Sequence, residues 1–64
     1  MITTSYDPEA DAVYVRIAPK GTEIAGTREV EPGIILDMDA NGRVIGIEVL
    51  GVRARSTAAV TLVA

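Results

Sequence analysis

The sequence predicts an all-β domain, a curved antiparallel meander of four to five strands. Residues 33–50 carry the strongest signal: two runs rich in β-branched residues flank Asp39-Ala40-Asn41-Gly42, a composition typical of a hairpin turn. Much of the remaining chain alternates apolar and polar residues between Pro and Gly breaks. That alternation is typical of strands with one buried face.

The central hairpin has a predicted register. A two-residue type I′ turn at Asn41-Gly42 implies the pairs Ala40–Arg43, Met38–Ile45, Leu36–Ile47 and Ile34–Val49. One face is then entirely apolar, and it consists of Ile34, Leu36, Met38, Ile45, Ile47 and Val49. The other face carries Asp37, Asp39, Glu48, Gly46, Ile35 and Val44. A slip of one residue would place Glu48 among the apolar residues, so burial opposes it. A longer, four-residue loop would sort the faces in the same way, so the sequence leaves the turn type open.

Two further segments complete the predicted sheet. Residues 2–6 form a short edge strand, and 12–17 form a second strand with Val13, Val15 and Ile17 on one side. Asp7-Pro8-Glu9-Ala10-Asp11 between them has type I turn chemistry, so we expect a hairpin. Residues 22–31 form a weaker strand, whose charges are typical of an edge.

The tail, residues 51–64, is variable in character. Residues 52–55 alternate as a strand does, whereas Ser56 or Thr57 is a suitable cap for a short helix through residues 58–63. The β-branched Val60, Thr61 and Val63 favour a strand. In either form this apolar tail is expected to pack on its own sheet or on a second subunit.

Length and composition limit the possible folds. Residues 1–64 allow one small domain, and a chain of this size buries only about 60% of its unfolded surface. The chain has no Cys and no His, which excludes disulfides and removes the commonest zinc ligands. Oligomerisation is the remaining means of stabilising a small core, so we expect a homodimer.

Charge and aromatic content limit the classes of partner that this chain can bind. The net charge is −3 without a basic stripe, and Phe and Trp are absent, so we expect no nucleic-acid binding. No apolar run approaches the length of a membrane span, and no signal peptide is recognisable. We therefore expect a cytoplasmic protein.

Two segments, YDPEADAVYVRI at 6–17 and TREVEPGIILDMDANGRVIGIEVL at 27–50, resemble domain of unknown function 2283 in order and spacing. This bacterial and archaeal family of small proteins covers residues 1–50, and the tail at 51–64 lies outside the pattern. The resemblance implies a compact antiparallel β domain without established activity or agreed catalytic residues. In some relatives the gene is thought to lie beside a gene for a small toxin-like protein. The resemblance therefore implies an antitoxin-like role.

The hairpin sequence also matches a calcium-binding pattern. Residues 37–48 satisfy the EF-hand loop, with Asp37, Asp39 and Asn41 as ligands and Glu48 in the bidentate position. An EF-hand loop joins two helices, however, and strand-like runs flank this one. The turn alone explains the residues, so we expect no metal site. The alternative is a weak divalent-cation or small-ligand site at Asp37, Asp39 and Glu48, with open space above Gly46.

No catalytic constellation is evident. A chain without Cys or His leaves its Ser, Thr and Lys side chains without a base to activate them. The paired carboxylates are expected to lie on a solvated face rather than in a cleft, where acid–base chemistry needs them. Tyr6 and Tyr14 are expected to be hydrogen-bonded residues of the core or its rim, with interface anchors as the alternative. We expect neither enzyme activity nor a cofactor.

The predicted apolar face defines the functional hypotheses. A single layer cannot cover its own face, so we expect two sheets to pack together in a homodimer. The first hypothesis is an interaction module, antitoxin-like toward a small and basic partner. The alternative is the small-ligand or cation-binding β domain. The face comprises Val13, Val15, Ile17, Ile34, Leu36, Met38, Ile45, Ile47 and Val49.

Overall fold

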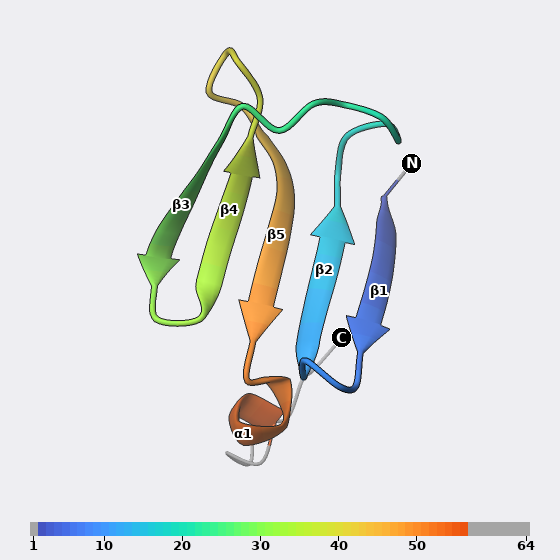
Figure 1. Ribbon diagram of the computed structural model, residues 1–64, viewed down its shortest axis with the longest axis vertical. Helices are drawn as coiled ribbons and strands as arrows, with labels where there is room; N and C mark the ends of the chain where they lie inside the picture. The colour runs from blue at the N-terminus through green and yellow to red at the C-terminus, as the bar shows by residue number, and fades with distance from the viewer. Residues whose placement is uncertain (1, 57–64) are drawn as a thin grey trace.

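A computed structural model describes residues 2–56 as one open antiparallel sheet with a short helix at its end (Figure 1). The strands are β1 (Thr3–Asp7), β2 (Ala12–Arg16), β3 (Gly26–Glu31), β4 (Ile34–Met38) and β5 (Val44–Leu50), followed by α1 (Val52–Ser56). The all-β class and the five strands predicted before residue 51 are confirmed. Within the described residues, no helix is long and apolar enough to cross a membrane.

The strand order is β1-β2-β5-β4-β3, which departs from an uninterrupted meander because β5 rather than β3 lies beside β2. The strands β3, β4 and β5 follow one another as consecutive hairpins. The β1–β2 hairpin, predicted around the Asp7–Asp11 turn, joins them through the antiparallel β2–β5 pair. Residues 17–25 cross one end of the sheet to reach the far edge, as the green segment in Figure 1 shows. The predicted edge positions of the first and third strands are confirmed.

The β4–β5 hairpin has the predicted register in its body but not at its turn. Leu36 pairs with Ile47 and Ile34 with Val49, as expected. The pairs Met38–Ile45 and Ala40–Arg43 are wrong, because the register shifts after Asp37 and Met38 pairs with Val44. This shift adds one residue to β5, which is the definition of a β-bulge.

The turn itself closes on Asp39. The Asp39 N–H donates to the Arg43 carbonyl at 2.9 Å, and the Gly42 N–H donates to the Asp39 carbonyl at 3.0 Å. Gly42 has a φ of +81°, but Asn41 does not have a positive φ, so the turn is not type I′. The Asp39 carboxylate stabilises this turn, because its Oδ1 accepts the N–H groups of Asn41 and Arg43 at 2.8 and 3.0 Å.

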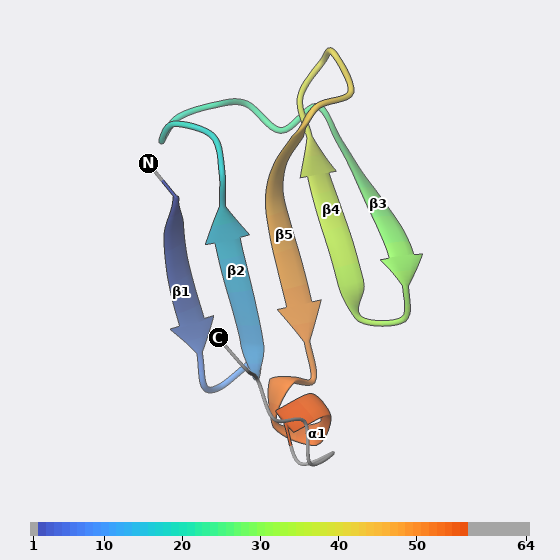
Figure 2. The same ribbon diagram turned by 180° about the vertical axis from the view of Figure 1, so that it is seen from behind.

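One face of the sheet is apolar, and we call it the apolar face. Its rows follow from the pairing: Val13–Val49–Ile34 and Val15–Ile47–Leu36. Of the nine residues predicted for it, only Ile45 is buried, at 4% exposure, whereas Ile17 is 40% exposed and the rest are half-buried. Helix α1 lies beyond one end of the strands in both views and covers neither face (Figures 1 and 2).

The segment after Leu50 is helical rather than extended. The predicted strand at residues 52–55 is wrong, since Val52–Ser56 forms α1. Of the two predicted caps, Ser56 lies within α1 rather than before a helix, and Thr57 lies outside the described residues. The helix or strand expected through residues 58–63 lies outside the described residues. Alternation over four residues is a weak signal, and a contact from a distant turn decides the conformation here.

Candidate functional site

The centre of the opposite face, which we call the polar face, is closed by one side chain. Tyr14 on β2 lies across Gly46 on β5, and its hydroxyl donates to Oδ2 of Asp37 on β4 at 2.9 Å. Gly46 is essential to this arrangement, because a Cβ at that position would lie 2.6 Å from Cζ of Tyr14. Three adjacent strands are therefore joined by a single tyrosine.

Asp37 is the buried carboxylate of the described residues, with an exposed fraction of 8%. A charged group at this depth requires a hydrogen-bond partner, and Tyr14 supplies it. Partial burial, followed by the hydrogen bond and the negative charge of Asp37, raises the pKa of the Tyr14 phenol above its ordinary value. The Arg16 guanidinium lies 5.7 Å from the centre of the Tyr14 ring and acts in the opposite direction.

The predicted cation residues serve other purposes in this structure. Asp37 accepts the Tyr14 hydroxyl, Asp39 accepts two backbone N–H groups of its own turn, and Glu48 lies opposite Tyr14 in the β2–β5 pair. The expected open space above Gly46 is wrong, because the Tyr14 ring fills it. The expectation of a solvated Asp37 is wrong for the same reason. Within residues 2–56, no three Asp, Glu, His or Cys side chains gather as a metal-binding group.

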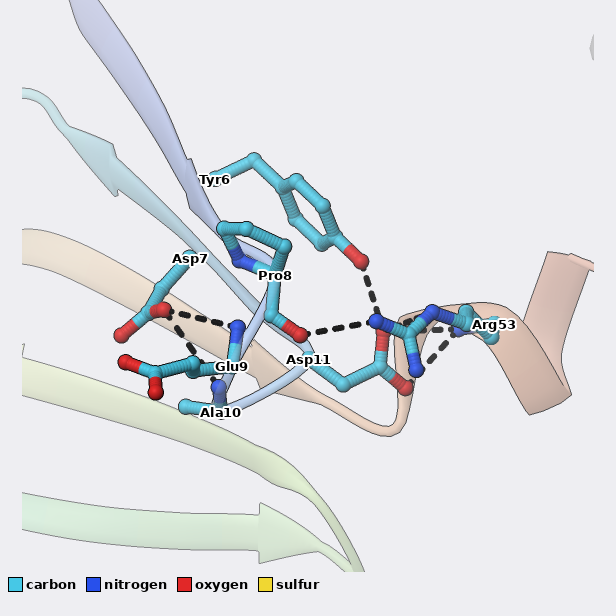
Figure 3. Close-up of polar contacts among 7 residues, drawn as sticks. All are labelled: Tyr6, Asp7, Pro8, Glu9, Ala10, Asp11 and Arg53. Atoms are coloured by element: carbon cyan, nitrogen blue, oxygen red, sulfur yellow. Dashed lines mark hydrogen bonds and ion pairs between the residues drawn. The ribbon is translucent and has the colours of Figure 1, made fainter.

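The β1–β2 turn holds the start of helix α1 through Asp11 (Figure 3). The Asp11 carboxylate accepts the Arg53 backbone N–H at 3.1 Å, and its carbonyl accepts the Val52 N–H at 3.2 Å. The Asp11 carboxylate also accepts the Tyr6 hydroxyl at 3.0 Å. The Arg53 guanidinium donates to the Pro8 carbonyl at 2.7 Å. Asp11 thus acts as a helix cap from 42 positions away in sequence.

The same turn is organised internally by Asp7. Its Oδ1 accepts the backbone N–H groups of Glu9 and Ala10 at 3.0 and 3.4 Å, as Figure 3 shows. This is the predicted turn chemistry of an Asp preceding Pro. Asp11 completes the reversal with a φ of +54°, a left-handed conformation that Asp tolerates better than most residues.

A second arginine of α1 contacts the β3–β4 turn. The Arg55 guanidinium donates to the carbonyl oxygens of Pro32 and Leu50, and its Nη1 lies 3.6 Å from Oε2 of Glu31. Gly33 makes room for it, since a Cβ there would lie 2.7 Å from Nη2 of Arg55. Helix α1 therefore bridges the turns of both outer hairpins at one end of the sheet.

Two shallow hollows open along β1. The first is lined by Thr3, Arg16, Ala18, Pro19 and Lys20, and it carries two positive charges. The second includes Ser5, Asp7, Tyr14 and Glu48, and it is acidic. Thr3, Ser5 and Asp7 lie opposite Arg16, Tyr14 and Ala12, so all three belong to the polar face.

The Tyr14–Asp37 bond and the Asp11–Arg53 contact could not be found from the sequence. Both depend on the order of the strands, and nothing local indicates that β2 lies beside β5. The glycine at 46 was the available signal, because a Gly inside an apolar strand often marks a close approach of another group. The expectation that Tyr6 and Tyr14 are hydrogen-bonded is confirmed.

Comparison with known proteins identifies the family of this chain. The family model described as a protein of unknown function (DUF2283) matches residues 4–53, and that span contains β1 without its first residue, the other four strands and the first two residues of α1. The chain belongs to the DUF2283 family. This DUF2283 match includes Arg53, which contacts the β1–β2 turn. No curated protein and no solved structure matches the chain.

Proposed function

We propose that this DUF2283 chain is a non-catalytic interaction module that associates with a second copy through its apolar face. One observation carries the proposal: only one of the nine residues of this face is buried in the single chain, while seven are half-buried and one is exposed. Within residues 2–56, no second layer covers them. Apolar faces of this kind mark sites of association in soluble domains, because water contact with them is unfavourable.

A second copy suits this face for a physical reason. The face is uncharged at its centre, where Val15, Ile47 and Leu36 form one row. Two such sheets pack with their strands inclined by about 30°, which lets both apolar sides interdigitate. A two-fold axis places the same residues on both sides, so the contact is closed and does not lead to filaments.

The polar face then remains available to a different protein. It carries Asp37 within the sheet and Glu48, Glu29 and Asp7 around it, on a chain whose net charge is −3. A small basic partner complements this charge and is attracted over long range. This part of the proposal corresponds to an antitoxin-like role, and it is supported by charge alone.

The test of the homodimer uses an exposed position on the apolar face. Ile17→Glu places a charge where the side chain is 40% exposed, so the single chain keeps its fold while association is expected to weaken by about tenfold or more. The matched control is Ile24→Glu, since Ile24 is similarly exposed at 45% but is not one of the nine residues of the apolar face. Sedimentation at micromolar concentrations measures both.

A wild-type chain that sediments as a monomer throughout this range would contradict the homodimer. The melting temperature provides an independent measurement, because it rises with protein concentration only when folding is coupled to association. Native mass spectrometry of the protein captured from its host tests whether a foreign partner binds. A stoichiometric basic chain supports the partner role, and multiples of 6.7 kDa alone contradict it.

A further inference from the structure

The two edges of the sheet differ in how they are protected. The β3 edge carries Arg28, Glu29 and Glu31, and its register is broken at Val30. Charges and bulges are the features by which natural edges avoid pairing with other strands. The β1 edge has no bulge and only one charge, at its last residue: its pairing with β2 is regular over Thr3–Asp7, all five residues are exposed, and residues 3–6 are uncharged. Its outer backbone groups are therefore available to another strand.

We propose that β1 pairs antiparallel with β1 of a second copy, about a two-fold axis at Ser5, to make one continuous sheet. This edge contact is separate from the contact through the apolar face and does not depend on it. An antiparallel pair of identical strands is self-complementary about a two-fold axis. The proposed occupant of the β1 edge is therefore a second copy of the chain. Both contacts together would join four chains.

The register follows from the length and sequence of β1. With Ser5 opposite Ser5 of the partner subunit, Thr4 meets Tyr6 of the partner subunit and Thr3 meets Asp7 of the partner subunit. All five residues of each strand are then paired. A centre at Tyr6 would bring Pro8 into the ladder, where it has no N–H to donate. A centre at Thr4 would leave Asp7 outside the paired strand.

Charge complementarity supports the same register. Asp7 of the partner subunit arrives beside Thr3, at the hollow that Arg16 and Lys20 line. By symmetry the contact occurs twice, so each copy brings one carboxylate to the positive hollow of the other. Since each chain has a net charge of −3, association needs local attractions of this kind.

The side chains also sort correctly between the faces. Antiparallel partners point to the same side of a sheet, so Ser5, Thr3 and Asp7 of both copies lie on the polar face. Tyr6 and Thr4 of both copies lie on the apolar side, in the rows of Val13 and Val15. The two apolar faces therefore become one wider face, which remains free to pack as proposed above.

The two-fold axis permits a charge-swap experiment in which residue 5 meets its own copy. Ser5→Lys places two lysines opposite one another, and Ser5→Glu places two glutamates, so each alone is expected to weaken the edge contact by about tenfold. An equimolar mixture restores association within a few-fold of the wild type, as a heterodimer with one chain of each kind. The matched control is Thr27→Lys on the β3 edge, which leaves association unchanged.

The measurements are made in the Ile17→Glu background, where the contact through the apolar face is weakened. Native mass spectrometry then reports the edge contact alone, and amide exchange of residues 3–7 reports their protection. The proposal is overturned if Ser5→Lys associates as the parent does, or if the mixture yields no heterodimer. If instead the wild type and Ile17→Glu are both dimers, the contact through the apolar face fails while the edge contact stands; if both are monomers, the edge contact is overturned as well.

Discussion

The two faces of a sheet usually differ in that apolar side chains are buried and charged ones are exposed. In this sheet the pattern is reversed. Only one of the nine residues of the apolar face is fully buried, whereas the polar face contains Asp37, a carboxylate that is only 8% exposed. Tyr14 explains the difference, because its ring covers Gly46 and its hydroxyl satisfies Asp37. The polar face is therefore stabilised within one chain, and the apolar face gains most from contact with another.

The largest expected effect comes from filling the space that Tyr14 occupies. Gly46→Ala is expected to destabilise the fold by roughly 2–3 kcal/mol, because overpacking displaces the ring and leaves Asp37 without its donor. For a domain of this size, that lowers the melting temperature by roughly 10 °C or more. Thermal unfolding followed by circular dichroism measures the change.

Gly26→Ala is the matched control, because a Cβ at that strand position meets no atom within 4 Å. It is expected to be neutral or to stabilise the domain by up to about 1 kcal/mol, since Ala loses less backbone entropy than Gly. Equal losses for the two alanine variants would mean that the Tyr14 ring does not close the polar face.

A smaller effect is expected when only the hydroxyl of Tyr14 is removed. Tyr14→Phe keeps the ring over Gly46 but leaves the buried Asp37 oxygen unpaired, at a cost of about 1–2 kcal/mol. Adding Asp37→Asn to this variant is expected to recover part of the loss, because a neutral amide is less costly to bury than a charge. Urea unfolding of the four-variant cycle gives the coupling between the two side chains; a coupling near zero would contradict the bond.

The smallest effect concerns alkaline pH. Because the pKa of Tyr14 is raised in the folded state, the stability that it contributes is complete below the ordinary tyrosine pKa of about 10 and is lost as pH rises through the higher folded value. Wild type is therefore expected to lose more stability above pH about 10 than Tyr14→Phe does. Tyrosinate absorbance of the Tyr6→Phe variant measures the titration of Tyr14 alone. A pKa of Tyr14 at or below the ordinary tyrosine value would refute this account.

The sequence predicts the local parts of this fold and leaves the long-range parts open. Turn residues and alternation locate the hairpins, and Leu36–Ile47 pairing follows from keeping Glu48 out of the apolar face. The sequence leaves the turn type open, and type I′ does not form because the Asp39 carboxylate binds two N–H groups of a different turn. The helical Val52–Ser56 depends on Asp11, and the site depends on β2 lying beside β5. No local pattern encodes either arrangement.

The β2–β5 pair also has a consequence for the order of folding. Every other strand pair closes over a short turn, whereas this pair joins Ala12 to Leu50, 38 positions apart. Because the entropy lost on closing a loop grows with its length, the two hairpin units are expected to form before they dock. Asp11 and Arg53 then meet only after docking. Formation of helix α1 is therefore expected to accompany the last step of folding.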